Sequence, residues 1–382
     1  MRTLLMLRSM MLTAALLAGL MVKPPAVAAA TPFILAPGAN QFAVFHSTIC
    51  AISDQHSLYC WGDNTWASMA QPKKKQHSNV PLRVGTGKWR SVYSGAGLCA
   101  IKWDRSVWCW GEYVPFIAQG RQEFRGPILV TQRKARSVEA IDSNHGMCIR
   151  AMDRSLWCRV DTSLFFRQGW HQVVRQPIIS ATSDGSAICY LLVTNKMKCW
   201  GTNSQGDFPT GPGTPRAVKK PRLVSGDYLQ LMRDYPCALD LDGYQRCWGI
   251  LNVSLPQRIS SSWAETFGGL CSRGFCVVTP SRVEDTLWDN LWSDQCGLLQ
   301  SGQVSCSHTM TGERGQAIGT TSLEGSWSEV EVSQGLGCGR KDEGQLWCWG
   351  LNDFATDSVS GPRLFGVDAS DYTLVPYQVT LP

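Results

Sequence analysis

Residues 335–352 read GLGCGRKDEGQLWCWGLN, and the rest of the chain is patterned on this unit. Two cysteines, Cys338 and Cys348, stand ten positions apart, and the turn-forming run Asp342-Glu343-Gly344 lies between them. The second cysteine opens a C-W-G triplet. The arrangement predicts two antiparallel strands joined by a short turn.

The same unit recurs along the chain. Seven cysteine pairs have a separation of ten, an eighth is shorter, and together they use all sixteen cysteines. The pairs are Cys50/Cys60, Cys99/Cys109, Cys148/Cys158, Cys189/Cys199, Cys237/Cys247, Cys271/Cys276, Cys296/Cys306 and Cys338/Cys348. Successive units start about 30 to 50 residues apart, which is typical of repeat arrays, propellers among them.

The separation of ten predicts a disulfide within each unit. Residues that face each other across an antiparallel pair have α-carbons about 4.5 or 5.5 Å apart, which suits a disulfide. We therefore expect eight local disulfides, from the first to the second cysteine of each pair. Reduced, buried cysteines are one alternative. A zinc site is another, although no C-x-x-C pair supplies ligand spacing.

The first thirty residues are typical of a signal peptide. Arg2 and Arg8 are basic, residues 10–22 form an apolar run, and residues 26–30 are small enough for cleavage. An uncleaved anchor is the alternative. Paired cysteines point independently to an oxidising compartment, so we expect a secreted or periplasmic protein with no membrane span after cleavage.

The charge of the chain argues against a nucleic-acid partner. The formal charge is +6, and Arg2, Arg8 and Lys23 of the signal contribute three of it, which leaves about +3. The remaining 31–382 segment is rich in Trp, Gly and Pro and shows no long amphipathic helical pattern.

A Pro-led strand recurs between the cysteine pairs, for example at Pro81 and Pro221. A Pro-led strand, an inner strand and a two-stranded hairpin make the four strands of a propeller blade. The sequence thus predicts one all-β domain over residues 31–382. Residues 376–381 are expected to close it by completing the blade that begins at residues 42–61, because closure removes the open sheet edges.

Part of the sequence resembles the regulator-of-chromosome-condensation repeat family. Residues 200–206, WGTNSQG, are the closest match to its G-x-N segment, and residues 61–64 and 349–352 match more briefly. The cysteine pairs resemble secreted bacterial members, such as propeller-type β-lactamase inhibitors, and crinkly-type ectodomains. The resemblance implies a closed propeller of seven blades, whereas the eight cysteine pairs leave eight blades as an alternative.

No motif of catalysis or of cofactor binding is found. The sequence holds no nucleophile elbow, zinc-protease motif, phosphate loop or calcium loop. His145 resembles a structural turn of the family more than a catalytic base. We expect no cofactor, no metal and no enzymatic activity. The Trp residues of the C-W-G triplets are expected to pack between blades, with an aromatic ligand cage as the alternative.

Irregular segments are the candidate binding sites, because repeat proteins carry their variable insertions on one face. Aromatic residues dominate interface hot spots. The candidate protein-binding residues are Trp66, Tyr113, Phe116, Phe165, Phe166, Phe208 and Phe354.

These features predict a monomeric, secreted scaffold that binds an extracellular or periplasmic protein through one loop-bearing face, as an inhibitor or an adhesin-like factor. Fold alone does not decide function, so two alternatives stay open. One is a glycan- or surface-binding module that uses exposed aromatic side chains. The other is an enzyme with a site at the central channel.

Overall fold

The computed structural model describes residues 31–72, 74–95, 97–111, 124–141, 146–160, 169–183, 187–202, 217–231, 237–241, 244–249, 253–262, 265–267, 295–298, 302–312, 315–333, 336–351 and 372–381. Pro32–Pro382 form one compact unit. Among the described residues no helix is long and apolar enough to cross a membrane.

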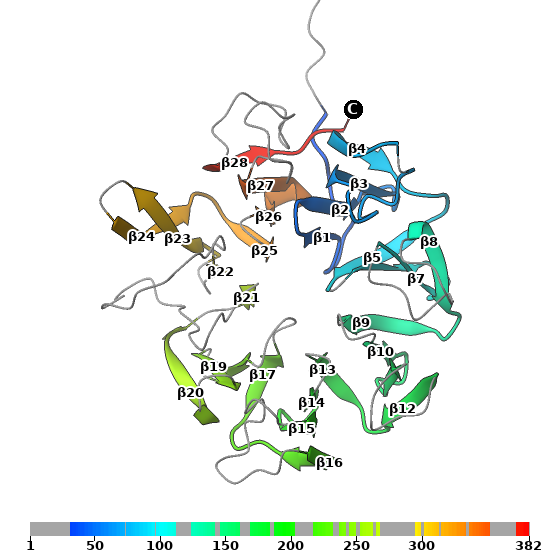
Figure 1. Ribbon diagram of the computed structural model, residues 1–382, viewed down its shortest axis with the longest axis vertical. Helices are drawn as coiled ribbons and strands as arrows, with labels where there is room; N and C mark the ends of the chain where they lie inside the picture. Colours follow the sequence, from blue (N-terminus) through cyan, green and yellow to red (C-terminus); the bar gives the residue numbers. More distant parts are fainter. Residues whose placement is uncertain are drawn as a thin grey trace, which may run out of the picture. The chain divides into compact units, whose positions relative to one another are not determined.

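The protein is all-β, and the described residues form seven four-stranded antiparallel sheets (Figure 1). In chain order the sheets are β1 (Phe42–Phe45), β2 (Thr48–Ile52), β3 (Leu58–Asp63) and β4 (His77–Arg83); β5 (Trp89–Ser94), β6 (Leu98–Lys102), β7 (Val107–Gly111) and β8 (Phe124–Thr131); β9 (Ala135–Ile141), β10 (Gly146–Ala151), β11 (Leu156–Val160) and β12 (Trp170–Val174); β13 (Ile178–Ser183), β14 (Ala187–Leu192), β15 (Met197–Thr202) and β16 (Ala217–Leu223); β17 (Tyr228–Leu231), β18 (Cys237–Asp240), β19 (Tyr244–Gly249) and β20 (Val253–Ser262); β21 (Glu265–Phe267), β22 (Gln295–Leu298), β23 (Val304–Gly312) and β24 (Gly315–Leu323); and β25 (Trp327–Ser333), β26 (Leu336–Lys341), β27 (Leu346–Leu351) and β28 (Tyr372–Gln378).

Five of the predicted disulfides are confirmed. They join Cys50 to Cys60, Cys99 to Cys109, Cys148 to Cys158, Cys189 to Cys199 and Cys338 to Cys348, with Cα atoms 4.0–4.1 Å apart. Cys237 faces Cys247, and Cys296 faces Cys306, in the same register. Cys271 and Cys276 lie outside the described residues. Each described disulfide therefore clips the second strand of a sheet to the third.

The expected place of the Pro-led strands is wrong. Pro81 lies in β4, which pairs with β3 of the hairpin before it, so each such strand is the outer strand that ends a sheet. The C-terminal strand β28 likewise pairs with β27 of the last sheet. It does not complete the sheet that begins at Phe42, because β4 already occupies that edge.

One hydrogen bond joins successive sheets at the same place. The residue six positions after the first cysteine has a positive φ at the hairpin tip, and its carbonyl accepts the N–H of the residue that begins the next inner strand. The pairs are His56 and Trp89, Arg105 and Ala135, Arg154 and Ile178, Asn195 and Tyr228, and Gly302 and Trp327, at 2.8–3.0 Å. The tips of these hairpins therefore all lie at the edge where the next sheet starts.

Four Trp residues of the C-W-G triplets pack between sheets, as predicted, while the side chain of Trp248 lies outside the described residues. Trp61, Trp110, Trp200 and Trp349 are buried. Trp61 shares an apolar cluster with Leu336 and Leu346 of the last sheet, while Trp110 packs in a cluster with residues of the first sheet. Burial of such large aromatic surfaces supplies much of the stability of each sheet contact.

The lead-in segment, residues 32–41, joins the last sheet to the first. Leu35 N donates to Gly344 O at the last hairpin tip, at 2.8 Å, which repeats the bond between the other sheets. Phe33 N donates to Val379 O at 2.8 Å, and Ala36 N donates to Ile52 O of the first sheet at 2.9 Å. Backbone groups of both sheets are thus satisfied by one short segment.

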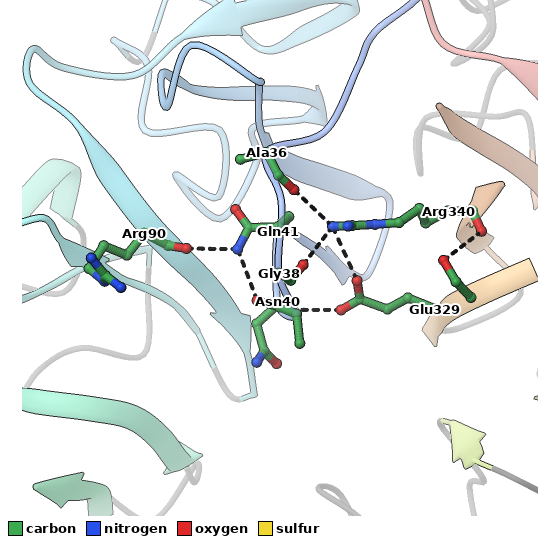
Figure 2. A network of polar contacts seen from close by, with 9 residues as sticks. Ala36, Gly38, Asn40, Gln41, Arg90, Glu329 and Arg340 are labelled. Carbon is green, nitrogen blue, oxygen red and sulfur yellow. Dashed lines mark hydrogen bonds and ion pairs between the residues drawn. The ribbon is translucent and has the colours of Figure 1, made fainter. Parts of the chain in front are cut away.

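A polar network fixes the far end of the lead-in (Figure 2). Arg340 Nη2 donates to Ala36 O and Gly38 O at 3.1 and 2.8 Å, and it lies 3.5 Å from Glu329 Oε2. Asn40 N donates to Glu329 Oε1 at 2.7 Å. An Arg–Glu pair of the last sheet therefore binds the backbone that enters β1.

A similar Arg–Glu pair binds the backbone of the next sheet between the third and fourth sheets. Arg150 Nε lies 3.0 Å from Glu139 Oε1, and Ala181 N of β13 donates to Glu139 Oε2 at 2.9 Å. Arg150 also donates to Ile179 O. Arg150 and Arg340 both stand two positions after the first cysteine of their pair. The repeat of this contact shows that the last sheet meets the lead-in as an internal sheet meets its neighbour.

The glycine of the first C-W-G triplet is required by the backbone. Gly62 has φ 109°, and a Cβ there would lie 2.1 Å from Ser47 O. Gly111, its counterpart in the second sheet, has φ 105°, but the nearest atom to its Cβ would be Trp66 O at 3.6 Å. The two positions share a conformation and differ in the space around them.

We expect Gly62→Ala to lower the free energy of unfolding by more than about 3 kcal/mol and Gly111→Ala by only about 1 kcal/mol. The first variant adds a clash with the backbone to the conformational strain that both share. Urea denaturation of the two variants measures the difference. Equal losses would show that the close approach to Ser47 is relaxed at no cost.

Candidate functional site

The loop between β3 and β4 is the candidate binding segment that the structure describes. It carries Trp66. The other candidates lie outside the described residues, and so does His145. These candidates are Tyr113, Phe116, Phe165, Phe166, Phe208 and Phe354.

Asp63 and Asn64 fold this loop onto itself. Asp63 Oδ1 accepts the N–H and the hydroxyl of Thr65 at 3.0 and 2.7 Å, which is an Asx-turn. Asn64 Nδ2 donates to Lys75 O at 2.7 Å, and Asn64 Oδ1 accepts from Met69 N at 3.1 Å. The Asn of the W-G-x-N segment therefore ties both ends of the loop together, which gives that part of the motif a structural role.

A second set of contacts holds the loop on the sheets. Thr48 Oγ1 donates to Asp63 O at 2.6 Å and lies 2.7 Å from Ser68 Oγ. Trp110 of the second sheet donates through Nε1 to Ser68 O at 2.7 Å. The side chain of Met69 is buried below. The loop is thus fastened to two neighbouring sheets, so its exposed side chains have fixed positions.

Trp66 differs from the Trp residues of the triplets. Its side chain is 40% exposed, whereas Trp61 and Trp110, on either side of the loop, are 2% and 0% exposed. An exposed indole on an ordered loop offers a large contact area at a small cost in conformational entropy. Its position therefore suits recognition of another molecule.

The described strands on either side of the other candidate segments end and begin at the same end of their sheets. Residues 112–123 separate β7 from β8, and residues 161–169 separate β11 from β12, as the Trp66 loop separates β3 from β4. In a four-stranded antiparallel sheet, these strand ends lie at the opposite end of the strands from the tip of the central hairpin. Because the described tips all lie on the side where the next inner strand begins, the flanking strand ends lie together on the other side.

The inner strands carry polar contacts between sheets. Ser94 Oγ of β5 donates to Glu331 Oε1 of β25, and His46 N donates to Ser333 Oγ of β25 at 3.2 Å. These contacts join polar groups of β25 to β5 and to the turn after β1. The observed bonds hold strands to one another. Within the described residues no cluster of His, Cys, Asp or Glu has the arrangement of a metal site.

Sequence reasoning missed a second set of exposed residues. Trp103, Met152, Val193 and Leu241 are exposed, and each stands four positions after the first cysteine of its pair. That spacing is visible in the sequence once the pairs are aligned. The spacing does not by itself indicate a site, because exposure of a single apolar side chain in a hairpin tip is ordinary.

Two hairpin tips share an Asp-Arg-Ser turn. Asp104 Oδ1 accepts Ser106 N and Oγ, and Asp153 Oδ1 accepts Ser155 N and Oγ. The hydrogen bonds from the serine hydroxyl, and then from the serine N–H, lower the pKa of each carboxyl group. Both carboxylates are thereby used in shaping the turns.

The fold has relatives among solved structures, all at low identity. Human WBSCR16 is similar at a TM-score of 0.59 and 13% identity, over 85% of this chain and 94% of that one. The crinkly ectodomain of the Arabidopsis thaliana receptor kinase ACR4 has a TM-score of 0.48 and 13% identity, over 87% and 99% of the chains. Yeast RCC1 (Prp20), solved bound to Kap60, has a TM-score of 0.45 and 13% identity, over 89% and 74%.

The similarity to WBSCR16 supports the fold that the repeats predict, an all-β arrangement of four-stranded antiparallel sheets that is consistent with a β-propeller. No model of a protein family matches the sequence. No curated protein sequence matches it either.

Proposed function

We propose that this protein is a secreted, non-enzymatic propeller of seven blades that binds another protein through the face that bears the β3–β4 loop. The bond between Leu35 and Gly344 supports closure, because it repeats between the last sheet and the lead-in the bond that joins the internal sheets. Phe33 and Trp61 also share one apolar cluster with Leu346 of the last sheet. A closed array leaves no sheet edge open to other chains.

Export is supported by the disulfides together with the sequence. Residues 1–30 have the composition of a signal peptide, and the cysteines of the five described bridges are almost fully buried. Disulfides of this number persist in an oxidising compartment. The partner is accordingly an extracellular or periplasmic protein.

The single observation that carries the binding proposal is the β3–β4 loop. Two buried polar side chains, Asp63 and Asn64, hold it in one conformation, and it presents Trp66 to solvent. Preorganised aromatic side chains are the usual anchors of protein interfaces. The scaffold below the loop is clipped by the Cys50–Cys60 disulfide, so binding would cost little ordering.

Cross-linking in the extracellular or periplasmic fraction of the source cells, followed by affinity measurement with the captured partner, tests this function. We expect Trp66→Ala to weaken the partner's affinity at least about tenfold, since a central aromatic anchor contributes that much. Trp103→Ala is the matched control, because Trp103 is 51% exposed at a hairpin tip on the opposite face. An equal loss in both variants, or a thorough search that captures no protein, would rule out this face.

A glycan-binding function is the second candidate, and the exposure of Trp66 favours it as well, since an exposed indole also stacks on sugar rings. A glycan array separates the two functions. Glycan binding that is abolished by Trp66→Ala, with no protein captured, would replace the protein-binding proposal.

A further inference from the structure

An arc of apolar side chains marks the tips of four successive hairpins. Trp103, Met152, Val193 and Leu241 are 51%, 44%, 45% and 50% exposed. They belong to the β6–β7, β10–β11, β14–β15 and β18–β19 hairpins, at the same position of each. The bonds from the first three of these hairpins to the next inner strand place their tips along one edge of neighbouring sheets, and Leu241 has the same position relative to its cysteine pair. We call these four residues, with the connections between them, the tip rim.

Basic residues alternate with the apolar tips along the rim. Trp103 N donates to Lys88 O at 3.0 Å, so the first tip lies against the connection that enters β5. Arg133 and Lys134 form the connection that enters β9, and Arg133 lies over the ring of Trp157 at 3.5 Å. Val193 N lies 3.4 Å from Pro177 O, beside exposed Arg175. Arg133 also acts on Asp153, next to Met152, so three of the four tips lie near a cationic connection. The connection that enters β17, in the sheet of Leu241, carries Asp227 instead, which pairs with Lys196.

Positive charge is concentrated around the tip of the β6–β7 hairpin. The guanidinium groups of Arg90 and Arg136 both act on Arg105, and the pKa of Arg105 is lowered by its burial and then by this repulsion. Arg90 also stacks on Trp103 at 4.7 Å. Like charges held this close to one another favour an anionic partner, whose binding would relieve the repulsion.

The rest of that edge has a different character. Asp54 occupies the tip position of the first sheet, and exposed Glu343 lies at the tip of the last. The exposed apolar residues of this tip position are therefore confined to the second to fifth sheets, although exposed Asp104 and Asp153 also lie at the second and third tips. A surface whose apolar tips all lie on one side would contact its partner with that side only.

We propose that the tip rim docks the protein on an anionic lipid surface, with the four apolar tips inserted at the headgroup level and the basic connections on the lipid phosphates. Each tip belongs to a separate sheet and is flanked by polar connections, so the rim forms no continuous groove for a peptide. A bilayer accepts isolated apolar tips one by one. Indole rings prefer the membrane interface, and Lys and Arg are drawn to anionic headgroups.

Co-sedimentation of the purified protein with vesicles tests the proposal. At low salt we expect the protein to pellet with equimolar phosphatidylglycerol–phosphatidylcholine vesicles and to stay in solution with phosphatidylcholine alone. Binding should fall as salt rises, because the attraction is screened. The double variant Arg133→Glu/Lys134→Glu should bind at least about tenfold more weakly, since each basic residue near the surface contributes about fivefold. Trp103→Ala/Met152→Ala should lose about tenfold through the lost apolar insertion.

Matched controls lie elsewhere on the molecule. Lys219→Glu/Lys220→Glu makes the same charge change on β16, and Trp66→Ala removes an exposed indole from the opposite face; both should bind the vesicles as the unchanged protein does. The proposal is overturned if the protein pellets with neither vesicle, if it pellets equally with both, or if control and rim variants lose binding alike. Urea denaturation of each variant separates lost binding from lost folding. A loss of partner binding in Trp66→Ala leaves this result untouched, because the two faces differ.

Discussion

Reduction of the disulfides should unfold the protein at room temperature. A bridge that closes a loop of about ten residues contributes about 3 kcal/mol by restricting the unfolded chain. Five such bridges are described. Their combined contribution, about 15 kcal/mol if the sheets act independently, is as large as the whole net stability of an ordinary domain. Denaturation in urea with and without a thiol reductant, followed by near-ultraviolet circular dichroism, measures the loss.

The rate of reduction supplies a second readout. The sulfurs are buried, with Cys50, Cys60 and Cys338 fully enclosed. A reductant can therefore reach them only after local opening, so reduction should be slow in buffer and fast in moderate urea. As the control, Cys99→Ala/Cys109→Ala removes one bridge and should lower the free energy of unfolding by about 3 kcal/mol while the other sheets stay folded. A fully reduced protein with an unchanged denaturation midpoint would contradict the role of the bridges.

The hairpins could be predicted from the sequence because their geometry is local. Ten positions between Cys50 and Cys60 allow one simple arrangement, in which the cysteines face each other across two strands, and the structure has it. The outer strand could not be assigned in the same way. In a periodic array, the order of the strands along the chain does not show at which strand each sheet begins. In the sequence, Pro81 lies about midway between the hairpin before it and the hairpin after it. Only the pairing of Leu82 with Cys60 decides it.

The position of the candidate loop could be predicted from the sequence, whereas its conformation could not. The irregular loop with Trp66 was visible because it interrupts the repeat, and its indole is exposed as a contact residue must be. What the sequence could not show is why the loop is ordered, since Asn64 reaches Lys75 and Trp110 reaches Ser68 through contacts that no spacing rule describes. The role of the lead-in could not be predicted from its sequence either, because the repeat pattern does not include it, yet Phe33 and Ala36 are completely buried.

Phe33→Ala should lower the free energy of unfolding by about 3–5 kcal/mol, the usual cost of deleting a buried aromatic side chain. The ring of Phe33 is fully buried, lies edge-on to Tyr59 at 5.7 Å and 6.0 Å from Trp61, and shares a cluster with Leu346 of the last sheet. The loss of stability should be local to the contact between the lead-in and the last sheet. Hydrogen exchange should quicken first at the N–H of Leu346 and of Val379, which bond to Phe33 O and to Leu346 O.

Ile178→Ala is the matched control for this contact. Ile178 is also fully buried, but it begins β13, where the third sheet meets the fourth. We expect a smaller loss of about 2–4 kcal/mol, with faster exchange confined to that boundary. If the array is closed through the lead-in, loss of the contact between Phe33 and the last sheet releases the lead-in and the C-terminal strand together. The reason is that no disulfide of the described residues joins the first sheet to the last. Phe33→Ala should then unfold in urea with a lower slope than Ile178→Ala, since native structure is partly opened before the main transition. Equal slopes, with exchange at Leu346 unchanged, would show that the lead-in lies on the sheets without holding them together.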